Sequence, residues 1–508
     1  MLHAMTRVTL WILGDQLLHD HPAMSGTTPD EARILLIESE SALRRRHYQP
    51  HKLALLLSAM RHYADEWRER GWQVDVTRAA TFAEGLRRHA AAHRTERLFT
   101  MAAASHAGCA FQERLGKTLG LPVTVLPNTQ FLTGRFNPIP DPQPGRRYVM
   151  ENFYRAMRRW FGVLMDGDEP AGGRWNFDAE NRRPLPRDLP LPEDDTFAPD
   201  AITRDALAEA RGPHPWPGYA TTRAEALAVL GRFLVERLPH FGAYEDAMTR
   251  RSHSLFHSML SPYLNLGLLE PLEVARAAET EYRAGRAPIN SVEGFVRQII
   301  GWREFMYWQY RRQGPAMAAQ NAWNATRPLP AFFWTGETDM ACLRHALGRA
   351  LATGYNHHIE RLMLLSNFLM LAGVDPAAAN EWFLSVYIDA YDWVMPPNVI
   401  GMGLNADDGL TATKPYIASA NYINKMSDHC AACPFDPKRR AGADACPFNF
   451  LYWNFLLAHE ARLRANSRFG PAVLGLSRLD ETARSAVRDA AGQFLATLSG
   501  EQPGANGL

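Results

Sequence analysis

Four of the five cysteines in the chain are spaced like metal ligands, and this spacing constrains the fold more than any other feature of the sequence. Cys430 and Cys433 form a C-x2-C pair, and Cys446 follows after twelve further residues. Two thiolates on so short a turn can point at one ion or at one face of a cluster, and two more complete a four-thiolate site. Because the fourth ligand, Cys342, lies far upstream, the fold must bring two distant segments together.

The identity of the metal is left open by this spacing, since four cysteines bind either zinc or an iron–sulfur cluster. A zinc-stabilised DNA-binding protein is therefore one interpretation. The first apolar segment runs directly into Gly14 without the cleavage site of a signal peptide, and metal-binding thiolates must stay reduced, so we expect a cytoplasmic protein. No stretch approaches about 18 consecutive apolar residues, so we expect no membrane partner.

The size and charge of the chain set only loose bounds on its function. With 508 residues, 46% of them hydrophobic, it can bury more than one core, and two or three domains are expected. The formal net charge is +1, which neither supports nor excludes a polyanionic partner. The function must therefore be inferred from motifs.

Residues 1–135 alternate short apolar runs with amphipathic segments such as 52–70. Strands separated by helices predict an α/β domain with a parallel, Rossmann-like sheet covered on both faces. Ligands of such sheets bind beyond the carboxyl ends of the strands, at positions such as 14–16 and 38–40, although ordinary loops explain these residues equally well. The expected strands are 8–13, 34–38, 74–77, 98–101 and 123–126.

The rest of the chain is predicted to be a connector followed by a large all-α domain. Six prolines between positions 170 and 199 indicate that 136–220 is an extended interdomain connector. Strand signals almost vanish over 221–495, where long amphipathic segments such as 223–238, 292–310 and 340–371 predict helices, the last interrupted near Gly354. Residues 496–508 are expected to be a flexible tail.

Polar side chains occur in the helical half where packing alone does not require them. Ser261 precedes a proline, and a serine at a helix start can bind phosphate, although a simple helix start explains it as well. His357 and His358 precede Arg361 by four and three residues, so each imidazole can approach the guanidinium unless this helical face is partly exposed. Asp389 offers a carboxylate that could pair with Arg361.

The segment just before the C-x2-C pair combines cationic and aromatic residues. Lys414, Tyr416 and Tyr422 can supply phosphate contacts and flat surfaces against bases. A solvated loop is the alternative.

In this order, the motifs resemble the photolyase/cryptochrome family, and within it the bacterial iron–sulfur branch that includes prokaryotic (6-4) photolyases. The resemblance runs nearly from end to end, and its most specific parts are the histidine pair, the segment 416–428 and the four cysteines. The other segments that carry it are 150–155 (MENFYR), 172–182 (GGRWNFDAENR), 261–264 (SPYL) and 302–304 (WRE).

The resemblance implies two cofactors in the helical domain. One is FAD, bound in a bent shape with Arg361 and Asp389 beside its isoalloxazine. The other is a [4Fe–4S] cluster on Cys342, Cys430, Cys433 and Cys446. The N-terminal part is of the antenna type, which holds 6,7-dimethyl-8-ribityllumazine in relatives. The FAD-binding residues that the resemblance implies are Tyr244, Ser258, Met259, Leu260, Ser261, Arg361, Asp389, Met395 and Asn398.

The implied activity is light-dependent repair of (6-4) pyrimidine photoproducts in UV-damaged DNA, by a monomeric carbon–carbon lyase. Reduced FAD would donate one electron to a lesion that has been flipped out of the duplex. A (6-4) product also needs an acid for its migrating group, and His358, with His357 beside it, is expected to hold that proton near neutral pH. Further residues implied are Tyr416 and Met402 in the lesion pocket, Lys414 and Tyr422 on DNA, and Trp382 and Trp334 in electron transfer.

Three positions depart from the pattern of the branch. Met395 stands where a glutamate near the flavin N5 is usual, and Phe383 stands where a tyrosine is common. Residues 101–106 (MAAASH) replace an acidic turn that borders the antenna pocket. The first two changes favour an alternative function, a cryptochrome-like blue-light photoreceptor with little or no repair activity, whereas the histidine pair favours repair.

Overall fold

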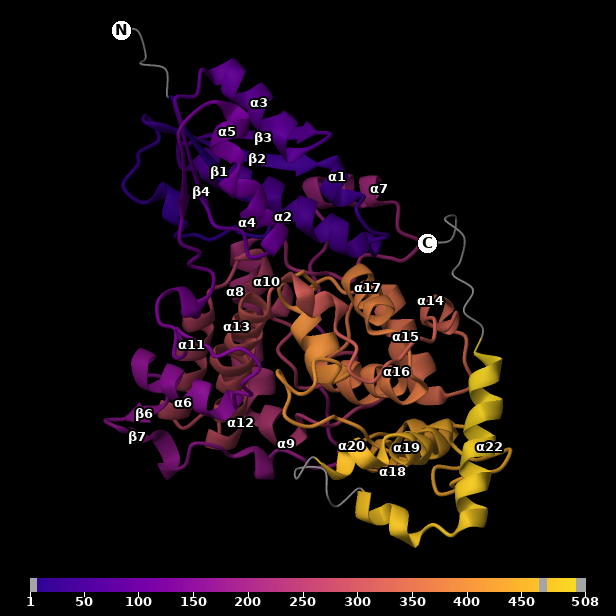
Figure 1. The fold of residues 1–508 in the computed structure, drawn as a ribbon. Coiled ribbons are helices and arrows are strands. Elements are labelled where there is room, and N and C mark those ends of the chain that lie inside the picture. The colour runs from indigo at the N-terminus through magenta and orange to yellow at the C-terminus, as the bar shows by residue number, and fades with distance from the viewer. Residues whose placement is uncertain (1–6, 466–472, 499–508) are drawn as a thin grey trace, which may run out of the picture.

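A computed structural model of the protein describes residues 7–465 and 473–498, and its N-terminal part contains the predicted parallel sheet (Figure 1). Five parallel strands lie in the order β3-β2-β1-β4-β5, as in doubly wound α/β folds. Each strand lies within two residues of its predicted bounds, so this part of the prediction is confirmed. The strands are β1 (Val8–Ile12), β2 (Ala32–Ser39), β3 (Gln73–Ala79), β4 (Arg97–Met101) and β5 (Val123–Leu126).

Helices cover both faces of this sheet because successive strand residues point to opposite sides. Leu10 and Ile12 of β1 belong to the core that includes α2 (Pro50–Glu69). Trp11, between them, packs instead with residues of β2 and of α3 (Phe82–His93). Three shorter helices complete the domain: α1 (Glu40–Leu43), α4 (His106–Glu113) and α5 (Leu115–Leu119).

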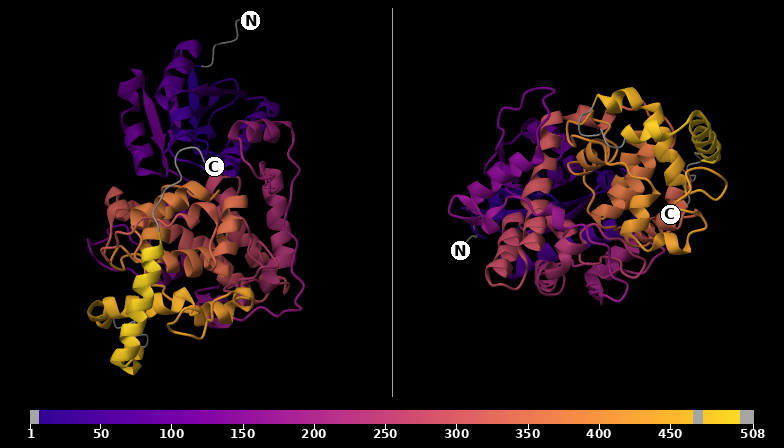
Figure 2. Two further views of the ribbon diagram at one scale, coloured as in Figure 1. Left: turned by 90° about the vertical axis from the view of Figure 1, so that its right-hand side faces the viewer. Right: turned by 90° about the horizontal axis from the view of Figure 1, so that it is seen from below.

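The connector expected over 136–220 is less extended than predicted. Helix α6 (Met150–Phe161) buries Phe153 and Tyr154 in the core shared with the helical domain, and helix α7 (Ala201–Ala210) packs against α2. A short hairpin, β6 (Met165–Asp166) with β7 (Glu169–Pro170), follows α6. Between these elements the chain runs along the outside of the molecule from the helical domain to the sheet domain (Figure 2).

The remainder of the described chain is helical, as predicted. Its α-helices are α8 (Arg223–Arg232), α9 (Leu238–Tyr244), α10 (Ser261–Leu266), α11 (Pro271–Arg283), α12 (Ile289–Val296), α13 (Glu304–Gln313), α14 (Phe332–Thr335), α15 (Ala341–Thr353), α16 (Asn367–Ala372), α17 (Pro376–Val386), α18 (Ala420–Met426), α19 (Pro447–Ala458), α20 (Glu460–Arg464) and α22 (Glu481–Thr497). The tail predicted at 496–508 begins inside α22, and residues 499–508 lie outside the described part.

The interruption of the helix predicted near Gly354 is present, and two observations explain why a glycine stands there. Gly354 ends α15 with a φ of 74°, and a Cβ at this position would approach the Ile388 Cγ2 to 2.7 Å. The chain resumes in a π-helical segment, η8 (Glu360–Ser366), and a second one, η9 (Pro397–Gly403), follows α17. Such segments are rare and are frequent at functional sites. They carry Arg361 and Asn398.

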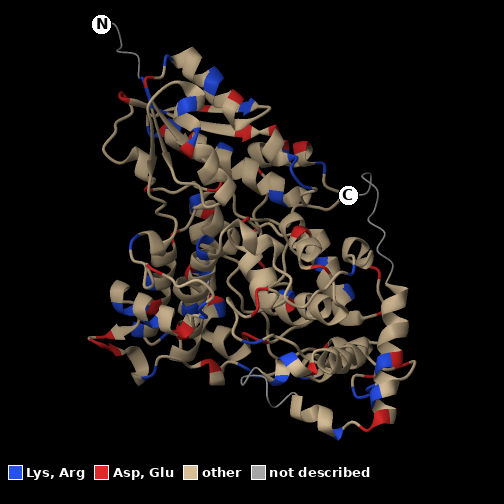
Figure 3. Cartoon of the chain, in the orientation of Figure 1, with Lys and Arg blue, Asp and Glu red and all other residues tan. Residues whose placement is uncertain are grey.

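Two large hydrophobic cores organise the molecule. One joins the sheet domain to α6 and to α8–α13, and the other surrounds α15–α19 and contains Cys342, Cys446 and Trp382. Cationic and anionic side chains are interspersed over both domains (Figure 3). No helix in the described ranges is long and apolar enough to cross a membrane.

Candidate functional site

The four predicted metal ligands line one small cavity. Cys342 lies in the first turn of α15, Cys430 lies in the short segment η10 (His429–Ala432), and Cys446 caps the start of α19. Burial raises the pKa of the Cys430 thiol to about 11 and that of Cys446 to about 12. A metal bound here would therefore displace protons from the thiols.

Four cysteine thiolates can hold either a single zinc ion or an iron–sulfur cluster. Four thiolates on one zinc, with Zn–S bonds of about 2.3 Å, lie about 3.8 Å from one another. Among the described residues, one group of three or more potential ligands has all its donor atoms within 4.8 Å of each other, and it lies in the sheet domain. No three of these cysteine sulfurs are therefore that close together. In a four-iron cube each thiolate binds a different iron, and the sulfurs stand farther apart.

A bidentate ion pair between Arg361 and Asp389 lies at the centre of the helical domain, as the resemblance implied. Nη1 and Nη2 are 2.8 and 3.1 Å from the two carboxylate oxygens. Ser261 Oγ donates to the same carboxylate at 2.6 Å, and Asn265 Nδ2 donates to the main-chain oxygen of Asp389 at 2.8 Å. Burial lowers the pKa of Arg361, but Asp389 outweighs this effect and the net shift is upward. The guanidinium is thus a fixed, charged anchor.

Three imidazoles gather near this ion pair. The ring of His257 stacks on that of His357 with centroids 4.3 Å apart, and it meets His358 edge-on at 5.2 Å. His357 is buried, and neither of its ring nitrogens has a hydrogen-bond partner in the described part of the chain. Burial, and then the neighbouring His358, lower the pKa of His357, so this ring is neutral at pH 7. Unpaired buried polar atoms are costly and mark a place where a bound molecule would supply partners.

His358 differs from the other two histidines because its side chain is 42% exposed. Its Nε2 lies 3.9 Å from Oε1 of Glu245, a buried residue that follows α9. Enclosure by protein atoms, and then Arg361, lower the pKa of His358 to about 4, whereas burial raises the pKa of Glu245 to about 7. In the protein without DNA these shifts favour Glu245 over His358 as the group that holds a proton near neutral pH, and the role of His358 in the reaction stays a prediction.

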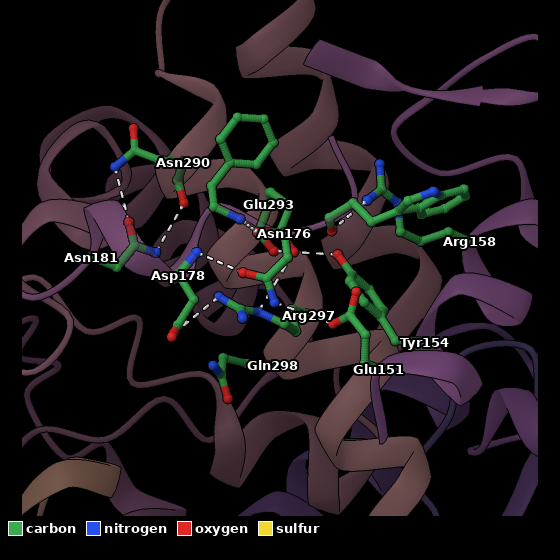
Figure 4. A network of polar contacts seen from close by, with 12 residues as sticks. Glu151, Tyr154, Arg158, Asn176, Asp178, Asn181, Asn290, Glu293, Arg297 and Gln298 are labelled. Atoms are coloured by element: carbon green, nitrogen blue, oxygen red, sulfur yellow. Dashed lines mark hydrogen bonds and ion pairs between the residues drawn. The ribbon is translucent and has the colours of Figure 1, made fainter. Parts of the chain in front are cut away.

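A polar network fixes Glu245 in this position, and Figure 4 labels the neighbouring residues Asp178, Asn181, Arg297 and Gln298. Gln298 Nε2 donates to Glu245 Oε1 at 2.7 Å, and Asn181 Nδ2 donates to Oε2 at 3.3 Å. Gln298 lies on the segment η6 (Arg297–Arg303), and Arg297 of this segment pairs with Asp178 at 3.5 Å. The connector motif 172–182, which carried part of the family resemblance, therefore supports this carboxyl group.

The residues predicted to face DNA lie on one stretch before the cysteines. Lys414 is exposed, and its Nζ lies 5.8 Å from the ring centroid of Tyr416. Tyr416 and Tyr422 are both half-buried, and Tyr422 contacts the carboxyl of Asp246, next to Glu245. Met402 is half-buried in η9. The stretch therefore lies close to the carboxyl–histidine pair through Tyr422.

The other predicted FAD ligands occupy the end of α9, the loop before α10, and η9 with its approach. Met259, in the loop, has a φ of 59°, which is unusual for a residue with a side chain and typical of strained functional loops. Leu260 and Met395 are buried. Tyr244, Ser258 and Asn398 are half-buried, and Asn398 Nδ2 donates to the Val394 oxygen at 2.8 Å.

An aromatic path leads from Arg361 toward α14. Tyr387 lies 3.9 Å from the Arg361 guanidinium, and its ring is 5.7 Å from that of Trp382. In the described residues, the rings in contact with Trp382 belong to Tyr387, Phe383 and Phe333, whereas Trp334 is half-buried beside them on α14. Phe383 stands where a tyrosine is common, and the centroid of its ring lies 5.4 Å from that of the Tyr387 ring.

Sequence reasoning missed Glu245, His257 and Lys52. Lys52 of α2 donates to the main-chain oxygens of Leu384 and Ala390 at 2.8 and 2.6 Å, so the sheet domain holds the chain next to Asp389. Burial lowers the pKa of Lys52 to about 7. A lone charged residue in an apolar helical pattern was the signal for Lys52, whereas nothing in the local sequence linked Glu245 to a histidine far downstream.

Comparison with known proteins agrees with this geometry. Residues 10–215 match the family described as deoxyribodipyrimidine photo-lyase-related protein. The chain is 41% identical over 503 residues to a (6-4) photolyase of Agrobacterium fabrum, which covers 96% of this chain and 99% of that protein. Among solved structures, a bacterial class III photolyase from Agrobacterium tumefaciens matches with a TM-score of 0.60 at 18% identity over 97% of each chain. A Synechocystis cryptochrome matches with a TM-score of 0.58 at 16% identity over 82% of this chain and 86% of that one.

The sheet domain joined to a helical domain is thus the architecture of photolyases and cryptochromes. The near full-length identity is more specific. The chain belongs to the photolyase/cryptochrome family, in the bacterial branch of the Agrobacterium (6-4) photolyase.

Proposed function

We propose that this protein repairs (6-4) pyrimidine photoproducts in DNA, using light. The observation that carries the proposal is the Glu245–His358 pair, which puts a proton-holding group at the partly exposed end of a buried histidine cluster. A protein that is 41% identical over nearly the whole chain is named a (6-4) photolyase, which supports the same reaction. Met395 and Phe383 favour the photoreceptor alternative, but the nearly full-length identity to a protein named a (6-4) photolyase outweighs them.

Two cofactors fit the residues of the helical domain. Arg361, fixed by Asp389 and Ser261, offers a flat cation to the ring system of FAD, and the strained loop at Met259 offers main-chain groups to its phosphates. The four cysteines line one cavity and offer four thiolates, which is the ligand set of a [4Fe–4S] cluster. FAD, when bound and reduced, supplies the photoexcited electron that cleavage of the lesion requires. The cluster would link α15 to the C-terminal helices.

The chain's own task in the reaction is to manage a proton. The migrating group of a (6-4) product must be protonated, whereas a cyclobutane dimer needs no such acid. Glu245 holds a proton up to about pH 7, and its Oε1 is 3.9 Å from His358 Nε2. The more exposed imidazole would lie nearer to the DNA phosphates than the buried carboxyl does, so their negative potential would raise the pKa of His358 more than that of Glu245 and favour transfer of this proton to the imidazole. We therefore assign His358 as the proton donor and Glu245 as the residue that supplies its proton.

Contacts with DNA would come from the stretch before the cysteines. The exposed cation of Lys414 suits a phosphate, and the half-buried rings of Tyr416 and Tyr422 suit a base that has left the stack. Met402 in η9 is the apolar contribution to the same pocket.

The test is illumination of the purified, reduced protein with an oligonucleotide that carries one (6-4) lesion, followed by chromatography of the product. We expect repair of this substrate and none of an oligonucleotide with a cyclobutane dimer. The His358→Ala variant should lose repair while it keeps lesion binding, and His47→Ala, at an exposed histidine of the sheet domain, should behave like wild type. Wild-type protein with intact flavin and no repair in light would refute the proposal.

A further inference from the structure

A second group of potential metal ligands lies in the sheet domain, far from the proposed repair site. Asp75 of β3 and His89 and His93 of α3 place one ligand atom each within 4.8 Å of the other two. Asp75 Oδ2 is 3.2 Å from His89 Nδ1 and 3.0 Å from His93 Nε2. Neither histidine gives this buried oxygen a well-aligned hydrogen bond, and Oδ2 has no hydrogen-bond partner among the described residues.

The local sequence explains why these groups meet. Thr9, Arg33 and Asp75 lie on neighbouring strands near their amino ends, on the face where Trp11, Leu35 and Leu86 form an apolar core with α3. His89 and His93 are four residues apart, so they lie one above the other on α3, which covers that face. Thr9, Arg33 and Asp75 thus lie at the amino ends of the strands. Ligands of such folds usually bind at the opposite edge of the sheet, beyond the carboxyl ends.

We propose that Asp75, His89 and His93 form a binding site for a divalent transition-metal ion, with Zn²⁺ as the best match. Three protein ligands of nitrogen and oxygen type, with a fourth position open, are a common zinc set. Bonds of about 2.0–2.1 Å in a tetrahedral arrangement place ligand atoms about 3.3 Å apart. The two observed separations from Oδ2 are close to this value. The third separation, between the ligand nitrogens of the two imidazoles, is at most 4.8 Å.

The surroundings prepare the ligands for a metal. His89 Nε2 lies 3.1 Å from Thr9 Oγ1, and a proton on Nε2 leaves the Nδ1 lone pair free to face Asp75.

Arg33 is the main argument for a purely structural ion-pair cluster. Its Nη1 lies 3.1 Å from Asp75 Oδ1 and already neutralises part of the carboxylate charge. This cation weakens metal binding, but it engages Oδ1 and leaves Oδ2 to the two histidines. It also fixes the carboxylate plane. The bound ion would fasten the last turns of α3 to β3, a role independent of the proposed DNA repair.

The experiment measures Zn²⁺ binding to the full-length protein, isolated with its cysteine site loaded, by competition with a chromophoric chelator. We expect one additional Zn²⁺ per chain in wild type. His93→Gln, a change at a side chain that is 33% exposed, should lose this ion, and Thr9→Val should bind it about 10- to 100-fold more weakly. The control is His62→Gln. His62 Nε2 also contacts a carboxylate, that of Asp200 at 2.8 Å, but among the described residues no third potential ligand atom lies within 4.8 Å of both.

Co²⁺ substitution distinguishes this site from the cysteines. Cobalt bound by imidazole and carboxylate lacks the intense thiolate charge-transfer absorption of a cysteine site. Equal Zn²⁺ stoichiometry and affinity in wild type and His93→Gln would overturn the proposal. It would also be overturned if wild type bound no additional Zn²⁺, or if all bound Co²⁺ showed thiolate absorption.

Discussion

Replacement of Glu245 by glutamine should make the protein's stability respond differently to pH. Glu245 is buried and its pKa is raised from 4.5 to about 7, chiefly by desolvation. Between these values the folded state binds more protons than the unfolded state, so the free energy of unfolding falls as pH rises. Above about pH 7 the cost of burying the ionised group is fully present. The amide of Glu245→Gln carries no such cost.

The size of the effect follows from the shift itself. At 1.36 kcal/mol per pKa unit, the wild-type protein loses about 2.5 kcal/mol relative to Glu245→Gln between about pH 5 and about pH 8. The hydrogen bonds of the glutamine to Gln298 and Asn181 do not change with pH, and the change in the wild-type hydrogen bonds on ionisation is already contained in the pKa shift. The variant should therefore gain on wild type as pH rises, whichever protein is more stable at about pH 5.

Urea unfolding at these two pH values, followed by tryptophan fluorescence, measures the difference. Glu113→Gln, at an exposed end of α4, is the control and should show the same stability difference from wild type at both pH values within about 0.5 kcal/mol. If Glu245→Gln also shows a constant difference, Glu245 does not hold the raised pKa, and its role as proton source for His358 is refuted.

Three further predictions concern the cofactor sites. Asp389→Asn leaves the Arg361 charge buried and unpaired, so urea unfolding should show a free energy of unfolding lower by about 3–5 kcal/mol. Asp65→Asn, in an exposed ion pair, should lower it by under about 1 kcal/mol, and equal losses would contradict this reasoning. Cys433→Ser should abolish iron–sulfur absorbance near about 400 nm and release flavin; a normally folded variant that keeps its flavin would show that the cluster is not structural. Trp382→Phe should slow photoreduction of the flavin, followed by absorbance, and an unchanged rate would remove Trp382 from the electron path.

The alternation of apolar and amphipathic segments was sufficient to predict the sheet, because a buried parallel strand needs a continuous apolar run whatever covers it. All five strands lie close to their predicted bounds. The connector was harder to predict. Its prolines indicated an extended chain, but α6 forms because Phe153 and Tyr154 find a core to enter, and local composition does not encode that core.

The candidate site shows the same division. The pairing of Arg361 with Asp389 could be expected from the sequence, since each is a charged residue in an apolar setting and needs the other. The Glu245–His358 contact could not, because more than one hundred residues separate the two and no periodicity links them. The lowered pKa of His358 could not be foreseen from the sequence either, since it depends on desolvation in the folded protein.

The sequence by itself determined which residues can bind a metal: four cysteines, with one pair fixed on a single turn by its C-x2-C spacing. It also required that Cys342 meet the other three. Only the tertiary structure decided that all four cysteines line one cavity, because that depends on the packing of α15 against the segments that carry the other three cysteines. The same holds for Asp75, His89 and His93, whose ligand geometry arises where a helix crosses the end of a sheet.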